Sequence, residues 1–117
     1  RTEIERDVSF YTVIEHDGVI FACAALYAYP EAKTGEMAAL TVSTQVQGQG
    51  DGERVLKRIE QRAKAAGLDS IFVLTTRTTH WFLKRGFVLV APAWLPEARK
   101  RKYNWDRKSQ VLVKKIS

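Results

Sequence analysis

The sequence has 117 residues, 45% of them hydrophobic and 27% charged. This is typical of one soluble globular domain and excludes a disordered chain, and no apolar run approaches the roughly 20 residues of a transmembrane helix. The single cysteine, Cys23, excludes an internal disulfide and, with only scattered histidines, a metal site, and it indicates a reducing cytoplasm.

The chain is basic, and its N-terminal part has the composition of β-strands. A net charge of +6 predicts an anionic partner such as a nucleic acid, an anionic lipid or a polyphosphate cofactor. Residues 8–15 ("VSFYTVIE") and 19–27 ("VIFACAALY") are rich in β-branched and aromatic side chains, and the short turn between them, with Gly18, predicts a β-hairpin. Residues 35–42 ("GEMAALTV") are apolar on both faces, which predicts a central strand. The charged start has no initiator Met and no secretory pattern, so we expect a longer polypeptide.

The C-terminal part predicts helices that alternate with short strands. Residues 53–66 form an amphipathic helix that Gly67 should end. Its apolar stripe comprises Val55, Leu56, Ile59, Ala63 and Ala66. Further strands are expected at 70–76, 87–91 and 110–116, the last with a solvated lysine pair, and short helices at 79–86 and after Pro96. The predicted fold class is therefore α/β or α+β, with a mixed sheet in one domain.

Three glycines open the long helix, in the stretch "QGQGDG" (47–52), and no Ser, Thr or Asn caps it. About four backbone N–H groups at a helix start lack intrahelical partners, and glycines let an anion approach them closely. A phosphate group can therefore take the place of the cap. Asp51 and Glu53 could instead complement the helix dipole, and a plain glycine-rich turn stays open. The spacing fits neither the nucleotide-binding P-loop nor the Rossmann fingerprint.

Gln47, Gly50 and Gly52 match the pattern Gln/Arg-x-x-Gly-x-Gly/Ala, and "WFLKRGF" follows later in the chain. The chain thereby resembles the GNAT N-acetyltransferase superfamily. The resemblance implies a mixed, mostly antiparallel sheet flanked by helices, with a V-shaped splay between strands 35–42 and 70–76. It also implies that backbone groups near Leu40 and Val42 bind the carbonyl and pantetheine arm of acetyl-coenzyme A, without a metal. The pyrophosphate would lie on the cofactor loop, which comprises Gln47, Gly48, Gln49, Gly50, Asp51, Gly52 and Glu53.

Longer stretches narrow the resemblance. "CAALY" (23–27), "FVLTTRTTHWFLKRGF" (72–87) and "LPEARKRKYNWDRKSQVLV" (95–113) are similar to the C-terminal domain of bacterial N-acetylglutamate synthases. That family transfers the acetyl group of acetyl-CoA to the α-amino group of L-glutamate at the head of arginine biosynthesis. The resemblance implies a single domain over 1–117, without the family's amino-acid-kinase-like domain and without the N-terminal part of the acetyltransferase domain. It also implies a homo-oligomeric full-length enzyme in the cytoplasm.

The resemblance assigns roles to individual residues. Glu36 would be the general base, and Thr78 would donate a proton to the departing thiolate. Phe82 stands where many members carry Tyr and cannot donate a proton; Thr79 and a water are rivals of Thr78. Arginines would hold the carboxylates of glutamate. The implied substrate-binding residues are Arg77, Arg107, Ser109 and Arg1.

Other interpretations stay open. Glu36 could be an ordinary strand-edge residue, Cys23 is expected to be a core thiol, and His80 to be structural. The acceptor could be another amino acid or amine. A different class of function, a basic nucleic-acid-binding module, would use the run at 99–108 with Tyr103 and Trp105 as stacking aromatics, but it leaves the cofactor loop without a role. Neither a membrane nor a nucleic acid is the expected partner.

Overall fold

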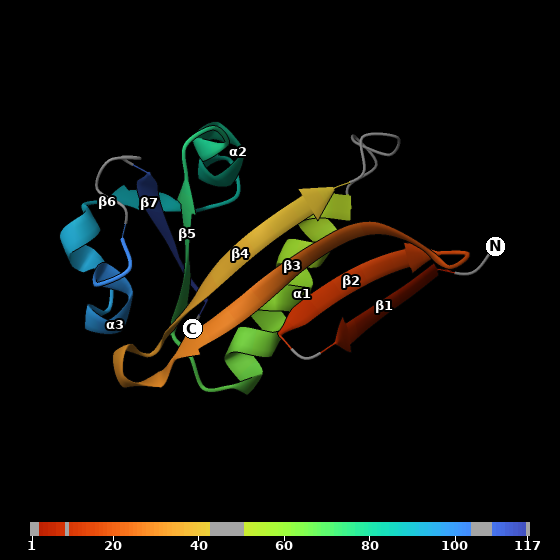
Figure 1. Cartoon of the computed structure of the whole chain (residues 1–117), viewed down its shortest axis with the longest axis horizontal. Coiled ribbons are helices and arrows are strands. Elements are labelled where there is room, and N and C mark those ends of the chain that lie inside the picture. Colours follow the sequence, from red (N-terminus) through yellow and green to blue (C-terminus); the bar gives the residue numbers. More distant parts are fainter. Residues whose placement is uncertain (1–2, 9, 43–50, 104–108, 117) are drawn as a thin grey trace.

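The computed structural model describes residues 3–8, 10–42, 51–103 and 109–116. Their strands form a seven-stranded sheet in the order β1-β2-β3-β4-β5-β7-β6 (Figure 1). β4 and β5 pair in parallel, and the other neighbours pair in antiparallel fashion. No helix among these residues is both long and apolar enough to cross a membrane. The elements are β1 (Glu3–Val8), β2 (Tyr11–His16), β3 (Val19–Tyr29), η1 (Pro30–Ala32), β4 (Thr34–Val42), α1 (Asp51–Ala65), β5 (Ser70–Thr75), α2 (Thr79–Leu83), β6 (Val88–Val90), η2 (Pro92–Trp94), α3 (Glu97–Lys100) and β7 (Gln110–Lys115).

The first three strands form an antiparallel meander. Val8 pairs with Tyr11, so the chain reverses inside the predicted strand 8–15, and that prediction is wrong. The β-branched and aromatic residues continue through this reversal without a Gly or Pro, and the charged composition of β1 is typical of an edge strand. The predicted hairpin between β2 and β3 is confirmed. Asp17 and Gly18 have φ of 52° and 81°, as a type I′ turn requires.

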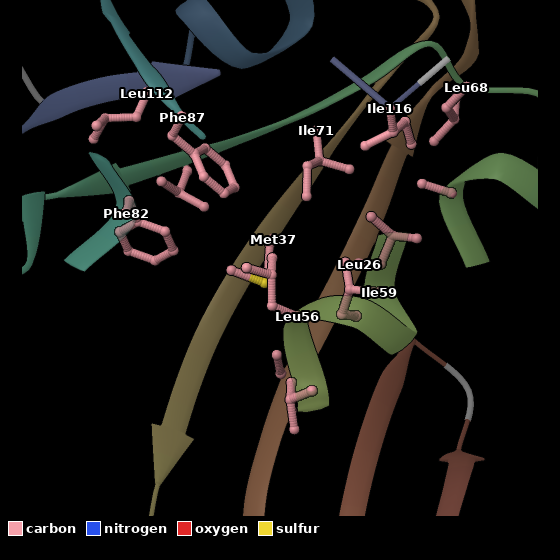
Figure 2. Packing of buried hydrophobic residues seen from close by; sticks show 14 of the residues in the cluster. Leu26, Met37, Leu56, Ile59, Leu68, Ile71, Phe82, Phe87, Leu112 and Ile116 are labelled. Atoms are coloured by element: carbon pink, nitrogen blue, oxygen red, sulfur yellow. The ribbon is translucent and has the colours of Figure 1, made fainter. Parts of the chain in front are cut away.

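One face of the sheet is covered by α1. Side chains alternate between the two faces along a strand, and Leu26 of β3 and Met37 of β4 point toward this helix. They are nearly fully buried together with Leu56 and Ile59 of α1, and Figure 2 shows the four side chains gathered beside the helix. This apolar cluster anchors α1 across the middle strands and thereby sets the position of its first turn relative to the sheet.

The predicted helix is confirmed, with a shift at its start. α1 begins at Asp51, so the last residues of the glycine stretch belong to its first turn. The expected stripe is buried at Val55, Leu56, Ile59 and Ala63. Ala66 is exposed, because the helix ends at Ala65. Gly67 has φ of 80° and is the expected stop.

The opposite face of β5, β6 and β7 is covered by the segment that contains η2 and α3. Leu95 and Tyr103, which flank α3, are buried with Phe72 and Val111 in a second cluster. Tyr29 of β3 packs against this cluster, with its ring centroid 6.0 Å from that of Phe72. α3 therefore lies on the face opposite α1, beside the junction of β4 and β5.

The prediction that both lysines at the end of β7 are solvated is wrong for Lys114. Nζ of Lys114 lies 2.9 Å from Oε2 of Glu60 in α1, whereas Lys115 is exposed. Alternation along the strand turns Lys114 toward the helix, where the carboxylate is within reach. Only the packing of α1 on β7 could reveal this contact.

Candidate functional site

The sheet opens between β4 and β5. The two strands are paired from Thr34–Ser70 to Glu36–Phe72, although β4 continues to Val42 and β5 to Thr75. Figure 1 shows the two strands diverging beyond this point. In the described part of both strands, no ladder pairing joins them after Glu36, so backbone groups of β4 face the opening. The predicted V-shaped splay is confirmed.

A β-bulge lies in the diverging part of β4. Ala25 pairs with Ala38 but Cys23 pairs with Thr41, which leaves one extra residue in β4. Ala39 has φ of 56°, a left-handed conformation that is uncommon for a residue with a Cβ. Bulges redirect the backbone locally, and the predicted carbonyl- and pantetheine-binding groups near Leu40 and Val42 follow this one directly. The sequence gives no signal for it.

Glu36 lies at the point where the two strands part. It is only 8% exposed, and it faces away from α1 because its neighbour Met37 faces the helix. Arg99 of α3 donates from Nε to Oε1 at 2.7 Å and from Nη2 to Oε2 at 3.3 Å. Sequence reasoning missed this partner. A buried carboxylate requires a counter-charge, but the basic run at 99–108 offers several candidates for it.

Two tyrosines of β3, Tyr27 and Tyr29, are close enough to Glu36 for its charge to affect their pKa values. Burial raises the pKa of Tyr29, the Glu36 carboxylate raises it further, and Arg99 opposes the rise. Tyr27, which pairs with Glu36 across the sheet, also has a raised pKa, first because of Tyr11 and then because of burial and Glu36. Both phenols are therefore protonated at neutral pH and can donate hydrogen bonds on this face.

Thr78 lies at the start of α2, beside the end of β5. The hydroxyl oxygens of Thr75 and Thr78 are 2.9 Å apart, and the Thr75 oxygen also accepts the backbone N–H groups of Arg77 and Thr78 at 3.2 and 3.0 Å. A hydroxyl oxygen has two lone pairs, and both are then in use, so Thr75 must donate to Thr78. The hydrogen of the Thr78 hydroxyl is left to donate elsewhere. The rival Thr79 instead donates to Gln110.

Arg77 and Ser109 lie at this same end of the sheet. Thr75 pairs with Gln110, which places Ser109, the residue before β7, beside the loop after β5. Arg77 is exposed and Ser109 is half-buried. The Ser109 carbonyl accepts the hydroxyl of the buried Tyr103 at 2.6 Å. Of the predicted substrate-binding residues, the structure thus places these two at the same end of the sheet, while Arg1 and Arg107 lie outside the described residues.

The start of α1 is the described end of the predicted cofactor loop. Gly52 and Glu53 lie in its first turn, where backbone N–H groups have no acceptor within the helix and the dipole is positive. The Glu53 carboxylate is occupied by Arg85, whose Nη2 lies 2.6 Å from its Oε1. Glu53 can therefore offer a phosphate only its backbone N–H. The remaining predicted loop residues, Gln47, Gly48, Gln49 and Gly50, lie outside the described residues.

Arg85 ties the end of α2 to the start of α1. Its guanidinium carbon lies 3.9 Å from the centroid of the Trp81 ring, and its Nη1 donates to the Trp81 carbonyl at 3.0 Å. This contact holds the first turn of α1 against the α2 segment, and the sequence prediction did not include it. The spacing of Trp81 and Arg85, four residues apart near a helix, is the signal that could have suggested their stacking.

The structure also bears on the nucleic-acid, cysteine and metal interpretations. Tyr103 is buried, 8% exposed, so it is not a surface aromatic on which a base could stack, and Trp105 lies outside the described residues. Cys23 is half-buried. Among the described residues, no group of three or more His, Cys, Asp or Glu side chains is placed to hold a metal ion.

Comparisons with known proteins agree with this geometry. A model of the acetyltransferase (GNAT) family matches residues 1–87. The amino-acid acetyltransferase of Ralstonia nicotianae is 60% identical over 116 residues, which are 99% of this chain and 26% of the relative. That of Escherichia coli (strain K12) is 46% identical over 113 residues, 97% of this chain and 26% of the relative. The chain thus spans about a quarter of the length of these relatives.

A solved structure confirms the fold. N-acetylglutamate synthase from Neisseria gonorrhoeae, complexed with coenzyme A and N-acetyl-glutamate, superposes with a TM-score of 0.89 and 41% sequence identity. The match covers 93% of this chain and 26% of that chain. The family match covers most of the chain, and the predicted family and the mixed, mostly antiparallel sheet are both confirmed. The chain belongs to the acetyltransferase (GNAT) family.

Proposed function

We propose that this chain is the acetyltransferase domain of an N-acetylglutamate synthase and transfers the acetyl group of acetyl-CoA to the α-amino group of L-glutamate. The observation that carries the proposal is the position of Glu36 where β4 and β5 part. The similarity to the Neisseria gonorrhoeae synthase supports glutamate as the acceptor. The reaction would be the first step of arginine biosynthesis, in the cytoplasm, and the full-length enzyme a homo-oligomer.

The residues at the splay suit acetyl-CoA as a substrate. An extended pantetheine arm carries amides, and it could pair with the free edge of β4 much as an added strand would. Backbone N–H groups near Leu40 and Val42 would polarise the thioester carbonyl. The first turn of α1, with Gly52, would bind the pyrophosphate.

Acetyl transfer forms a bond between the amine nitrogen and the thioester carbonyl carbon and breaks the bond between that carbon and sulfur. Glu36 would accept the proton that the nitrogen loses, directly or through a water. The departing thiolate would take a proton from Thr78, whose hydrogen is not used by Thr75. Solvent would then return a proton to Thr78 and take one from Glu36, and the products are N-acetyl-L-glutamate and coenzyme A.

Arginines would select the acceptor. Arg77 at the end of β5 and Arg107 would pair with the carboxylates of glutamate, with Ser109 and Arg1 as further contacts. Charge-assisted hydrogen bonds contribute about 1.5–3 kcal/mol, so Arg77→Ala should raise the KM for glutamate roughly 10- to 100-fold. The KM for acetyl-CoA should stay unchanged, because Arg77 follows β5, whereas Gly52 and Glu53, at the described end of the cofactor loop, lie in the first turn of α1.

The test is release of free thiol from acetyl-CoA by the full-length protein, with a panel of amino acids and mass spectrometry of the product. We expect L-glutamate to accelerate release most, and L-glutamine to be a poor acceptor because it lacks the side-chain charge. Faster release with another amino acid would keep the reaction and replace the acceptor. Failure of every amine to accelerate release would overturn the proposal.

A further inference from the structure

We propose that Arg99 is a positioning residue for the reaction: its two-point ion pair holds the Glu36 carboxylate at the splay in the orientation that accepts the proton of the incoming amine. This inference rests on the proposed function. It is carried by the contact between the two side chains, at 2.7 and 3.3 Å, and by the position of Glu36 in the sheet.

The pair is built into the fold. The side chains of Glu36 and Arg99 are 11% and 18% exposed, so the contact is not one of the solvated surface pairs that contribute little. Each carboxylate oxygen accepts one donor from the planar guanidinium, which fixes the plane of the carboxylate as well as its position. A carboxylate has about four lone-pair sites, so each oxygen keeps a site for the amine or a bridging water.

The helix that carries Arg99 is itself anchored. Leu95 and Tyr103 on either side of α3 are buried against β5 and β7. The hydroxyl of Tyr103 donates to the carbonyl of Ser109, beside the proposed acceptor residues. The segment 95–103 therefore connects the proposed base at one side of the splay to the proposed acceptor contacts at the other. A shift of this segment would therefore act on Glu36 through Arg99 and on Ser109 through Tyr103.

The neighbouring basic residues do not share this arrangement. Lys100 pairs at 3.3 Å with Glu97, a glutamate on the same helix whose side chain is 79% exposed. Arg101 is exposed. Arg99 therefore pairs with the proposed base, whereas Arg101, two positions later, is exposed and can serve as a matched control.

The experiment compares Arg99→Ala, Arg99→Lys and the control Arg101→Ala in the full-length protein. Misplacement of a reacting group by about 1 Å can cost about 100-fold, so we expect Arg99→Ala to lower kcat by roughly 10- to 100-fold. The KM of Arg99→Ala for acetyl-CoA should equal that of the parent. The control Arg101→Ala should keep both the kcat and the Tm of the parent. Arg99→Lys should recover only part of kcat, because an ammonium cannot reproduce the fork.

Chemical rescue separates positioning from a merely structural role. Guanidinium ion, added well below denaturing concentrations, should restore part of the kcat of Arg99→Ala, whereas neutral urea at equal concentration should not. A kcat of Arg99→Ala or Arg99→Lys equal to that of the parent would overturn the proposal. A loss of kcat in Arg99→Ala that guanidinium cannot restore, together with a lowered Tm, would also overturn the proposal. If Arg99→Ala does not fold, Arg99→Lys alone decides by the same kcat comparison.

A readout without turnover keeps this inference separate from the proposed function. In the parent, the Nε–H proton of Arg99 should give a slowly exchanging ¹⁵N-correlated signal that Glu36→Gln shifts or abolishes and that Arg101→Ala leaves in place. Absence of that signal from the parent would overturn the pairing, even in an active enzyme. A parent that shows the signal but acetylates no amino acid would refute the proposed function instead.

Discussion

The two faces of β4 are buried in different surroundings, although the residues that line them are neighbours along the same strand. Met37 faces α1 and is buried among aliphatic side chains. Glu36, the residue before it, faces α3 and is also buried, but its carboxylate is paired with the guanidinium of Arg99. Burial is similar on both sides, and its chemistry is not. The α1 face stabilises the fold through the hydrophobic effect. The α3 face instead holds the Glu36–Arg99 ion pair largely away from solvent, at the proposed site of proton transfer.

This contrast predicts that substitutions on the α1 face lower stability and that substitutions on the α3 face lower turnover. Substitutions at Glu36 and Ile59 test that separation, and those at Thr75 and Asp7 extend it to the end of β5 and to the edge of the sheet. The expected effects are given from the largest to the smallest. In each case both quantities are measured on the same protein, because only the pair of values distinguishes the two faces.

The largest effect is expected from Glu36→Gln. It keeps the shape of the side chain but removes the proposed proton acceptor, so kcat should fall about 10²- to 10⁴-fold, with unchanged affinity for coenzyme A in calorimetry. Glu15→Gln, at another buried carboxylate of the N-terminal strands, is the control and should keep its turnover. Comparable losses in both variants would show that buried charge in general, and not the position of Glu36, matters.

Ile59→Ala tests the α1 face. Ile59 is 0% exposed, and truncating such a residue leaves a cavity, so the free energy of unfolding should fall by about 2–5 kcal/mol. Denaturant titration measures it, and Lys57→Ala on the exposed side of α1 is the control. Turnover per folded molecule should be unchanged, and a large loss of kcat in folded Ile59→Ala would break the separation.

Thr75→Val and Thr75→Ser test the end of β5. Valine has nearly the same shape but can neither accept the two backbone N–H groups nor donate to Thr78. One hydrogen bond contributes about 0.5–1.5 kcal/mol, so kcat should fall up to roughly tenfold. Serine keeps the hydroxyl and should keep most of the activity. Equal activity of the two variants would contradict a role for the Thr75–Thr78 contact.

The smallest effect is expected at the edge of the sheet. Burial raises the pKa of Asp7, but hydrogen bonds from Arg58 and Thr12 and the charge of Arg62 outweigh it, and the pKa lies below the ordinary value of 3.8. Asp7 therefore stabilises the fold above about pH 4, and the contribution is lost as the pH falls through its folded-state pKa. The Asp7 and Arg58 side chains remain 30% and 38% exposed, so the contribution is at most about 1 kcal/mol.

Asp7→Asn should therefore lower the free energy of unfolding slightly at neutral pH and not at all well below pH 4. Denaturant titrations at both pH values measure the difference, and turnover should not respond. A destabilisation that persists at low pH would show that Asp7 acts through packing and not through its charge.

Local patterns predicted much of the fold. The apolar stripe of α1 repeats with the period of a helix, and the stretches that became β3, β4, β5 and β7 have the composition of strands, so these elements were predicted near their observed bounds. The reversal between β1 and β2 was missed, because nothing in its residues distinguishes it from a continuing strand. At the site, the position of Glu36 at the splay came from the resemblance, and the described part of the sheet agrees with it.

The sequence by itself determined the elements whose signal is short-range: the period of α1, the positive-φ turn at Gly18 and the stop at Gly67. Only the tertiary structure decided which cation of the basic run meets Glu36, since that contact joins residues 63 positions apart. It also decided that Thr75 donates to Thr78, because that follows from where two backbone N–H groups point. Such choices depend on strand register and on the packing of α3, and a one-residue change in register would turn every side chain of a strand to the other face.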